Sequence, residues 1–291
     1  MTRRILLIML ALSLFALPVF AGGAQEEPAT EPAATAEKPV SLEKTTMDPR
    51  LYTPGKLTVA TGEPAYPPWM MDDDPESGIG FENGMIYALA EKLGFAKDDV
   101  VWVRQTFDQG IAPGSKPYDF NLQQYTVTED RKEFVDFSMV YYQPEKAVVA
   151  LPGSGASSAK SFADLRALKW GATIGTADLD YIENMIGVDD AAVFNDQIGT
   201  FQALLGGQID VTCIELPTAL FVTAVQVPEA TVAAILPHDP KDLGHGLIFE
   251  KDSPLVDWID EGLEAIIADG VVADLAKEYL YGGNSVPEIS K

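Results

Sequence analysis

Cysteine and histidine, the residues that most often bind transition metals, are scarce in this chain. Its 291 residues include one cysteine, Cys213, and two histidines, His238 and His245. One cysteine cannot form an internal disulfide, and a single cysteine with two histidines supports a zinc site poorly. We therefore expect neither a metal nor another cofactor. The apolar run 209–214 predicts a buried strand around Cys213, which lies too far from the amino terminus to be a lipid-attachment site.

Basic residues are also few: 20 lysines and arginines stand against 44 aspartates and glutamates, for a net charge of −24. Phosphate binding needs a basic surface, so we expect no nucleic acid partner and no bare anionic membrane surface. The acidic excess suits a secreted protein that its charge keeps in solution. Attraction of cationic ligands is the alternative. The chain is long enough for two lobes with cores of their own.

The amino terminus has the pattern of a signal peptide. Arg3 and Arg4 precede a mostly apolar run over 5–20, and Val19-Phe20-Ala21 offers a small-residue cleavage site. The run is short for a membrane span, so we predict cleavage and export to the periplasm over an uncleaved anchor. Residues 22–55 are rich in Ala, Pro, Glu and Thr, which predicts a disordered linker.

Ordered sequence is expected from about Lys56. A β-rich run at 57–61, a helix over 82–93 and a strand at 100–103 predict a parallel α/β layer. The later pattern is similar and predicts these elements: strands at 169–174 and 209–214, helices capped by Ser161 and Thr200, a helix with Pro217 in its first turn, and a helical pair from Ser253 that Gly270 interrupts. Two such units would leave a cleft beyond the carboxyl ends of their strands.

Arg131 is placed against its local preference. Thr128 is a good helix N-cap, and acids suit the first turn of a helix, but a cation there opposes the helix dipole. An arginine fork matches a carboxylate with two parallel hydrogen bonds. The residues alone leave two interpretations open: a ligand carboxylate, or a salt bridge to Glu129 or Asp136.

Other polar loop residues also have two interpretations each. The turn 175–178 offers backbone N–H groups to an anion, although Asp178 there is typical of any helix start. Glu215 ends an apolar strand, where it could meet an ammonium group or cap the next helix. Tyr66 and Trp69 could stack on a ligand or form a packed turn. Phe81, taken alone, fits a core position.

Seven motifs occur in a fixed order between residues 56 and 282. They are LTVATGEPAYPPW, GFENGMIYALAEKLG, YTVTEDRKEFVDFSMVYY, WGATIGTAD, GGQIDVTCIELPTA, GHGLIFEKDSPL and EGLEAIIADGVVADLAKEYLYG. With these motifs the chain resembles the type II periplasmic binding proteins of polar amino-acid ABC transporters, solute-binding family 3. The stretch TVTEDR…VDFS is the most specific of them.

The resemblance implies an α/β fold of two lobes, each a mixed sheet flanked by helices, joined by a two-strand hinge. The first lobe would comprise 56–145 and 245–291, and the second 146–244. The hinge strands would lie near 142–147 and 243–249.

The resemblance also assigns ligand contacts. Arg131 would hold the α-carboxylate with Thr126 and the backbone of Thr176 and Ala177, and Glu215, where the family more usually has Asp, would hold the α-ammonium. Residues expected around the ligand side chain are Phe81 and Tyr66 as a sandwich, Trp69 as a further wall, Glu63 where relatives that bind cationic side chains place an acid, and Gln124 at a usually small position.

The implied function is binding of one amino acid, polar or basic, by closure of two lobes and its delivery to the membrane permease of an ABC importer. We expect a monomer without catalytic residues. The alternatives are a dehydratase or other lyase of the same fold, and a ligand-sensing subunit for a signalling partner.

Overall fold

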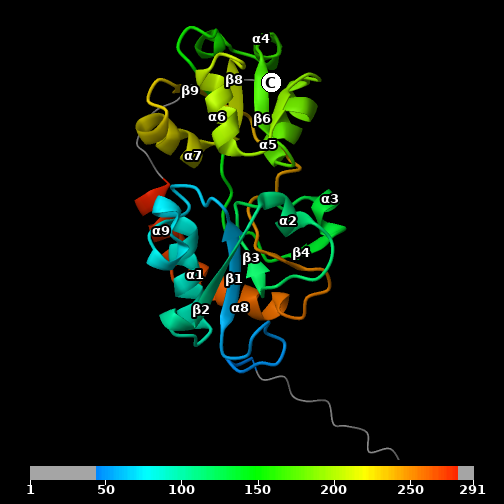
Figure 1. Ribbon diagram of the computed structural model, residues 1–291, viewed down its shortest axis with the longest axis vertical. Helices are drawn as coiled ribbons and strands as arrows, with labels where there is room; N and C mark the ends of the chain where they lie inside the picture. The colour runs from blue at the N-terminus through cyan, green and yellow to red at the C-terminus, as the bar shows by residue number, and fades with distance from the viewer. Residues whose placement is uncertain (1–43, 281–291) are drawn as a thin grey trace, which may run out of the picture. The chain divides into compact units, whose positions relative to one another are not determined.

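Two five-stranded sheets form the centres of two lobes in the computed structural model, which describes residues 44–280 (Figure 1). The predicted signal peptide over 1–21 lies outside the described residues, as do 22–43 and 281–291. No helix in the described part of the chain has the length and apolar character needed to cross a membrane.

The sheet of lobe 1 is mixed. Its strands, in spatial order, are β2 (Val100–Gln105), β1 (Leu57–Gly62), β3 (Phe120–Asn121), β10 (Ile248–Glu250) and β4 (Val135–Phe137). β1 runs parallel to both β2 and β3, whereas β10 is antiparallel to β3 and β4. β1 is buried along its whole length, as expected of a central strand covered on both faces. The late strand β10 thus completes a sheet that the first third of the chain begins.

Helices from both ends of the described chain cover lobe 1. They are α1 (Phe81–Lys92), α2 (Phe107–Ile111), α3 (Glu129–Lys132), α8 (Val256–Ala268) and α9 (Val271–Tyr279). Figure 1 shows α8 and α9 beside α1. A Cβ at Gly262 would lie 2.6 Å from Leu89 Cδ1, so glycine there lets α8 approach α1 closely. Leu89 is fully buried at this contact, and its burial contributes about 1.5–3 kcal/mol.

The sheet of lobe 2 is also mixed. Its strands, in spatial order, are β7 (Ala192–Phe194), β6 (Trp170–Thr173), β8 (Val211–Glu215), β5 (Lys146–Ala150) and β9 (Thr231–Ile235). β6 is parallel to β7 and β8, and β5 is antiparallel to β8 and β9. Cys213 is buried in β8, as predicted.

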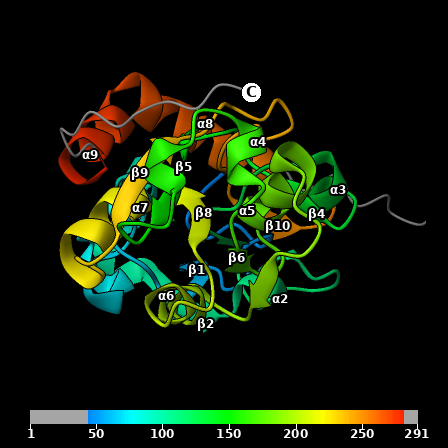
Figure 2. The ribbon, with the colours of Figure 1, turned by 90° about the horizontal axis from the view of Figure 1, so that it is seen from above.

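Helices lie on both faces of this sheet, as Figure 2 shows. They are α4 (Phe162–Leu165), α5 (Ala177–Asp180) with a π-helical continuation (Tyr181–Ile186), α6 (Gln197–Leu205), and α7 (Leu216–Phe221) with a π-helical continuation (Val222–Gln226). Successive β5 residues alternate between faces: Val148 packs in the cluster with α4 and α5, and Val149 in the cluster with α6 and α7. Short 3₁₀ helices complete the chain: η1 (Met71–Asp73), η2 (Pro75–Ser77), η3 (Lys97–Asp99) and η4 (Ala156–Ser158).

Two crossover segments, 138–145 and 236–247, connect the sheets. They meet at an antiparallel bridge between Tyr142 and His245, and His245 forms a second bridge with Thr126. The two-lobed α/β fold is therefore confirmed, and the predicted hinge corresponds to two crossover segments joined by an isolated bridge.

Two local expectations need correction. Residues 44–55, expected in the disordered linker, form turns on lobe 1: Leu51 is buried, and Tyr52 N donates to Asp119 Oδ1 over 2.6 Å. The composition of 22–55 as a whole predicted disorder and gave no indication that Leu51 would be buried. Helix α6 is capped by Asp196, which accepts from Gly199 N over 2.7 Å, because the helix begins before Thr200.

Candidate functional site

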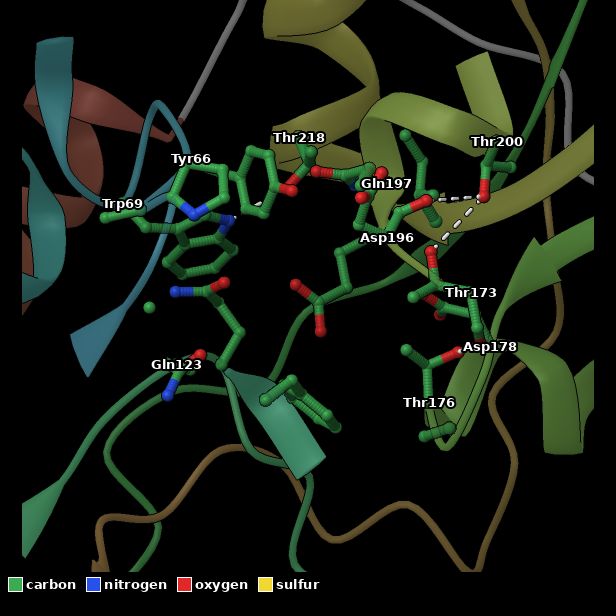
Figure 3. Close-up of a pocket in the computed structure, with 18 of the residues that line it drawn as sticks. Tyr66, Trp69, Gln123, Thr173, Thr176, Asp178, Asp196, Gln197, Thr200 and Thr218 are labelled. Carbon is green, nitrogen blue, oxygen red and sulfur yellow. Dashed lines mark hydrogen bonds between the residues drawn. The ribbon is translucent and has the colours of Figure 1, made fainter. Parts of the chain in front are cut away.

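A cavity of about 320 Å³ lies between the lobes (Figure 3). Lobe 1 contributes the loop after β1 and the loop that leads into α3. Lobe 2 contributes the turn between β6 and α5, the start of α6 and the end of β8. The lining sits beyond the carboxyl ends of β1, β6 and β8, where open α/β sheets bind ligands. Its size is within the range of small-molecule sites.

Arg131 reaches across the cavity from α3. Its guanidinium donates from Nη1 to Thr126 O over 2.7 Å and from Nη2 to Gly175 O, on lobe 2, over 2.9 Å. The side chain is 8% exposed, and the guanidinium carbon lies 5.5 Å from the centre of the Phe107 ring. Burial lowers the pKa of Arg131, although the negative charge of Asp180 acts to raise it.

The salt bridges that offered a local alternative for Arg131 do not form. Glu129 pairs with Lys132 at 2.8 Å, and Asp136 pairs with Lys251 at 2.8 Å. Within residues 44–280, Arg131 has no carboxylate at salt-bridge distance. A buried cation held only by backbone carbonyls favours an anion beside it.

The turn opposite Arg131 is fixed by local hydrogen bonds. Thr176 caps α5: its hydroxyl accepts from Leu179 N over 3.3 Å and donates to Thr173 O over 2.8 Å. Both Thr176 and Ala177 line the cavity, and Thr126 lines it from lobe 1. The residues assigned to a carboxylate by resemblance therefore surround one region.

Asp178 does more than start a helix. Its carboxylate pairs with Lys146 Nζ at 2.8 Å, and Asp242 lies 3.4 Å from the same nitrogen. Lys146 is 6% exposed and lines the cavity. Its burial opposes the charge, but Asp178, Glu215 and Asp242 outweigh burial and raise the pKa of Lys146. Lys146, a cation at the first position of a buried strand, was not among the predicted site residues.

Glu215 lines the cavity at the end of β8 and is bonded to a histidine. Its Oε1 lies 2.6 Å from Nε2 of His245, which is fully buried in the second crossover segment. Glu215 makes no capping hydrogen bond to α7, so the local alternative for this residue does not hold. Burial lowers the pKa of His245, but Glu215 outweighs it and the net shift is upward. The sequence analysis placed neither histidine at a ligand loop.

Two of the three predicted aromatic residues line the cavity. Tyr66 and Trp69 face it, and Trp69 Nε1 donates across the lobes to Thr218 Oγ1 over 2.8 Å (Figure 3). Phe81 is fully buried and does not line it: its ring packs 5.6 Å from Trp69 and 5.2 Å from Tyr142. Phe81 is the first residue of α1, and its side chain lies in the core, where it packs against the ring of Trp69.

Gln124 and Glu63 both line the cavity, but they differ in their hydrogen-bond and ion-pair partners within the protein. Gln124 has a left-handed backbone (φ 53°), and its N and Nε2 donate to Glu82 over 3.1 and 2.5 Å. The amide nitrogen of Gln124 is thus committed to the protein. Glu63 is exposed and forms no ion pair with any residue in 44–280.

The remaining lining includes polar residues that the sequence analysis did not identify: Gln123, Thr173, Asp196, Gln197, Thr200 and Thr218 (Figure 3). Thr200 donates to Asp196 O over 3.1 Å, and its hydroxyl lies 3.3 Å from that of Thr173. Burial, with the charge of Asp196, raises the pKa of Tyr66 to about 12. No local pattern marks these residues, because the fold of lobe 2 brings five of them together from separate segments and only Gln123 comes from lobe 1.

Comparisons with known proteins show the family and the fold. The family model described as "Bacterial extracellular solute-binding proteins, family 3" matches residues 57–282. An L-arginine-binding protein of Pseudomonas aeruginosa is 28% identical over 236 residues, which cover 76% of this chain and 88% of that protein. A probable histidine-binding protein of Campylobacter jejuni is 26% identical over 237 residues, covering 77% and 85%. The solved structure of an ancestral arginine-binding protein bound to glutamine is 27% identical, has a TM-score of 0.65, and covers 78% of this chain and 98% of its own.

Proposed function

Because the chain belongs to family 3 of the bacterial extracellular solute-binding proteins, we propose that it binds a free amino acid between its lobes. It then delivers the amino acid to the membrane permease of an ABC importer. The observation that carries this proposal is Arg131, a buried cation at the cavity with no carboxylate partner among the described residues.

An α-amino acid offers both charges that the cavity calls for. Its carboxylate can accept from the Arg131 fork and from the backbone at Thr176 and Ala177, and its ammonium can meet Glu215. Arg131 belongs to lobe 1, and Thr176 and Glu215 belong to lobe 2. A zwitterion therefore contacts both lobes at once and favours the closed state by its differential contacts.

The far side of the cavity favours a polar or basic side chain. Glu63 from lobe 1 and Asp196 from lobe 2 line it together with the rings of Tyr66 and Trp69. A guanidinium or ammonium group there gains from carboxylates and from aromatic faces. The names of the relatives, which bind arginine or histidine, support the same class of ligand.

We propose binding without chemical change of the amino acid. Of three glutamates that could act as acid or base, Glu82 is fully buried and does not line the cavity, whereas Glu63 and Glu215 line it and are proposed to pair with cationic groups of the ligand. The carboxylate of Glu82 accepts from Tyr141 Oη over 2.5 Å and from Gln124. A dehydratase or lyase needs an acid or base that touches its substrate. NMR of an amino acid incubated with the protein should show no product.

We also propose that the protein is exported by the segment 1–21 and acts as a monomer in the periplasm. When the full-length chain is expressed, we expect segment 1–21 to be cleaved off and the remaining protein to be secreted. Light scattering should then show a single species of about 30 kDa, since the full chain is 31.4 kDa.

Calorimetric titration with the twenty amino acids, ornithine, cystine and polyamines tests the proposal. We expect binding of one or a few polar or basic amino acids. Binding of polyamines without any amino acid would contradict it, because a polyamine has no carboxylate for Arg131.

A further inference from the structure

One carboxylate at the cavity is shared between the ligand site and a buried titratable group. Glu215 is bonded through Oε1 to His245 Nε2 at 2.6 Å. In the part of the chain that the structure describes, no other group forms a hydrogen bond to the Glu215 carboxylate. Glu215 also lines the cavity, so its second oxygen is available to an ammonium group.

The surroundings of His245 leave its charge dependent on Glu215. The ring is fully buried and lies 5.2 Å from Trp69, 6.0 Å from Tyr141 and 6.1 Å from Tyr142. Its other nitrogen, Nδ1, has no hydrogen-bond partner among residues 44–280. An imidazolium there would leave one N–H unpaired, so protonation is stabilised chiefly from the Nε2 side.

The other ionisable groups that face His245 come from three elements. Glu82 lies on α1, Asp242 on the same crossover segment as His245, and Tyr141 and Tyr142 on the first crossover segment. Glu82 is already bonded to Tyr141. Burial lowers the pKa of His245, whereas Glu215 raises it most and the carboxylates Glu82 and Asp242 add to that rise. No carboxylate but Glu215 is within salt-bridge distance of the imidazole, among the described residues.

Lys146 adds a cation on the ligand side of Glu215. The two residues are cross-strand partners of β5 and β8, and Lys146 is neutralised by Asp178 and Asp242. The ammonium of an amino acid would therefore be a new, uncompensated positive charge beside Glu215. Two cations that share one carboxylate in a buried site disfavour each other.

We propose that amino-acid binding releases a proton from His245, so that this histidine positions Glu215 and makes ligand affinity depend on pH. The inference rests on the proposed function, because it takes the ligand ammonium to lie at Glu215. The proton passes from imidazolium to solvent, and the bound ammonium takes over the pairing with Glu215.

The sign of the pH effect follows from linkage. If the complex has a lower His245 pKa than the free protein, affinity is highest above the free-protein value. The Kd then rises by at most about tenfold for each unit that the pH falls between the two values. Below both values it becomes constant again. Between pH 5 and 7 the carboxylate and ammonium of L-arginine keep their charges, so the dependence reports on the protein.

Calorimetry with L-arginine in two buffers of different ionisation enthalpy measures the proton directly. We expect release of up to one proton per bound L-arginine and a Kd that increases on acidification from pH 7 to 5. Proton uptake, or binding of L-arginine with no proton exchange and no pH dependence, would overturn the inference while leaving the proposed function intact. A protein that binds no amino acid would overturn both.

NMR assigns the proton without any variant, because the chain has only two histidines. The pKa of His245 should fall on addition of L-arginine. His245→Gln keeps a hydrogen-bond donor for Glu215 but cannot titrate, so it should bind L-arginine without proton release. His238→Gln is the matched control and should release the same proton as the wild type. Proton release that persists in His245→Gln would contradict the assignment.

Discussion

The two lobes present charge to the cavity in opposite ways. Two charged residues of lobe 2 are paired within the protein, Lys146 with Asp178 and Glu215 with His245 of the crossover segment, whereas Asp196 lines the cavity without a cation partner among the described residues. On lobe 1, the buried Arg131 has only backbone carbonyls as partners among the described residues. Lobe 2 therefore provides a prearranged, largely neutralised surface, whereas lobe 1 provides a charge that an anionic group completes.

This difference separates affinity from stability. Removing one member of a buried ion pair costs about 3–5 kcal/mol because the other member is left without compensation. Breaking the Lys146 network of lobe 2 should therefore act mainly on folding, and substitution of Arg131 mainly on ligand binding.

The largest effect on binding is expected for Arg131→Ala. The variant loses the fork that holds the carboxylate, so binding of an amino acid should weaken by about 3–5 kcal/mol, or roughly a hundredfold to several thousandfold. Calorimetry measures this change. Lys132→Ala is the matched control: it removes a cation one residue away that pairs with Glu129 and does not line the cavity. Equal affinities of Arg131→Ala and the control would contradict the role of Arg131.

The corresponding change on lobe 2 is Lys146→Met. It leaves Asp178 and Asp242 without their cation, so the free energy of unfolding at neutral pH should fall by about 3–5 kcal/mol. The loss should shrink as the pH falls, because protonated carboxyl groups need no cation. Urea unfolding of Lys146→Met beside Lys251→Met, which breaks the exposed pair with Asp136, makes the comparison. A similarly small effect for both variants would show that the buried network contributes little.

The smallest effect is expected at the exposed edge of lobe 1. Glu63→Gln removes a carboxylate that lines the cavity and that we propose to face the ligand side chain, so the affinity for L-arginine should fall a few-fold relative to that for L-glutamine. Glu76→Gln makes the same charge change in the exposed helix η2, outside the cavity lining, and should leave the ratio of affinities unchanged. An unchanged ratio in Glu63→Gln would remove this residue from side-chain recognition.

The features that could be predicted from the sequence are those coded by neighbouring residues. Helix α1 follows from its apolar spacing and the glycine after it, and the strand around Cys213 from its apolar run. The helix start at Thr128 follows from its capping hydroxyl, and the misplaced cation at Arg131 marked the site. These signals depend on local propensity and periodicity, which one sequence contains.

The features that were missed depend on register and on contacts between distant segments. The pair of Lys146 and Asp178 joins a strand to a helix that starts 31 residues later, and His245 reaches Glu215 from the second crossover segment. Composition could not reveal that Leu51 anchors the turns at 44–55. Phe81 was expected at the ligand by resemblance, but the packing of Trp69 over it could be seen only in the fold.

The central claim is that Arg131 binds the carboxylate of an amino acid. Calorimetric titration of the unmodified protein with L-arginine and with agmatine, the same molecule without its carboxylate, tests it most directly. We expect L-arginine to bind and agmatine to bind at least about a hundredfold more weakly, since the guanidinium of Arg131 would stay without an anion. Agmatine binding as tightly as L-arginine would contradict it.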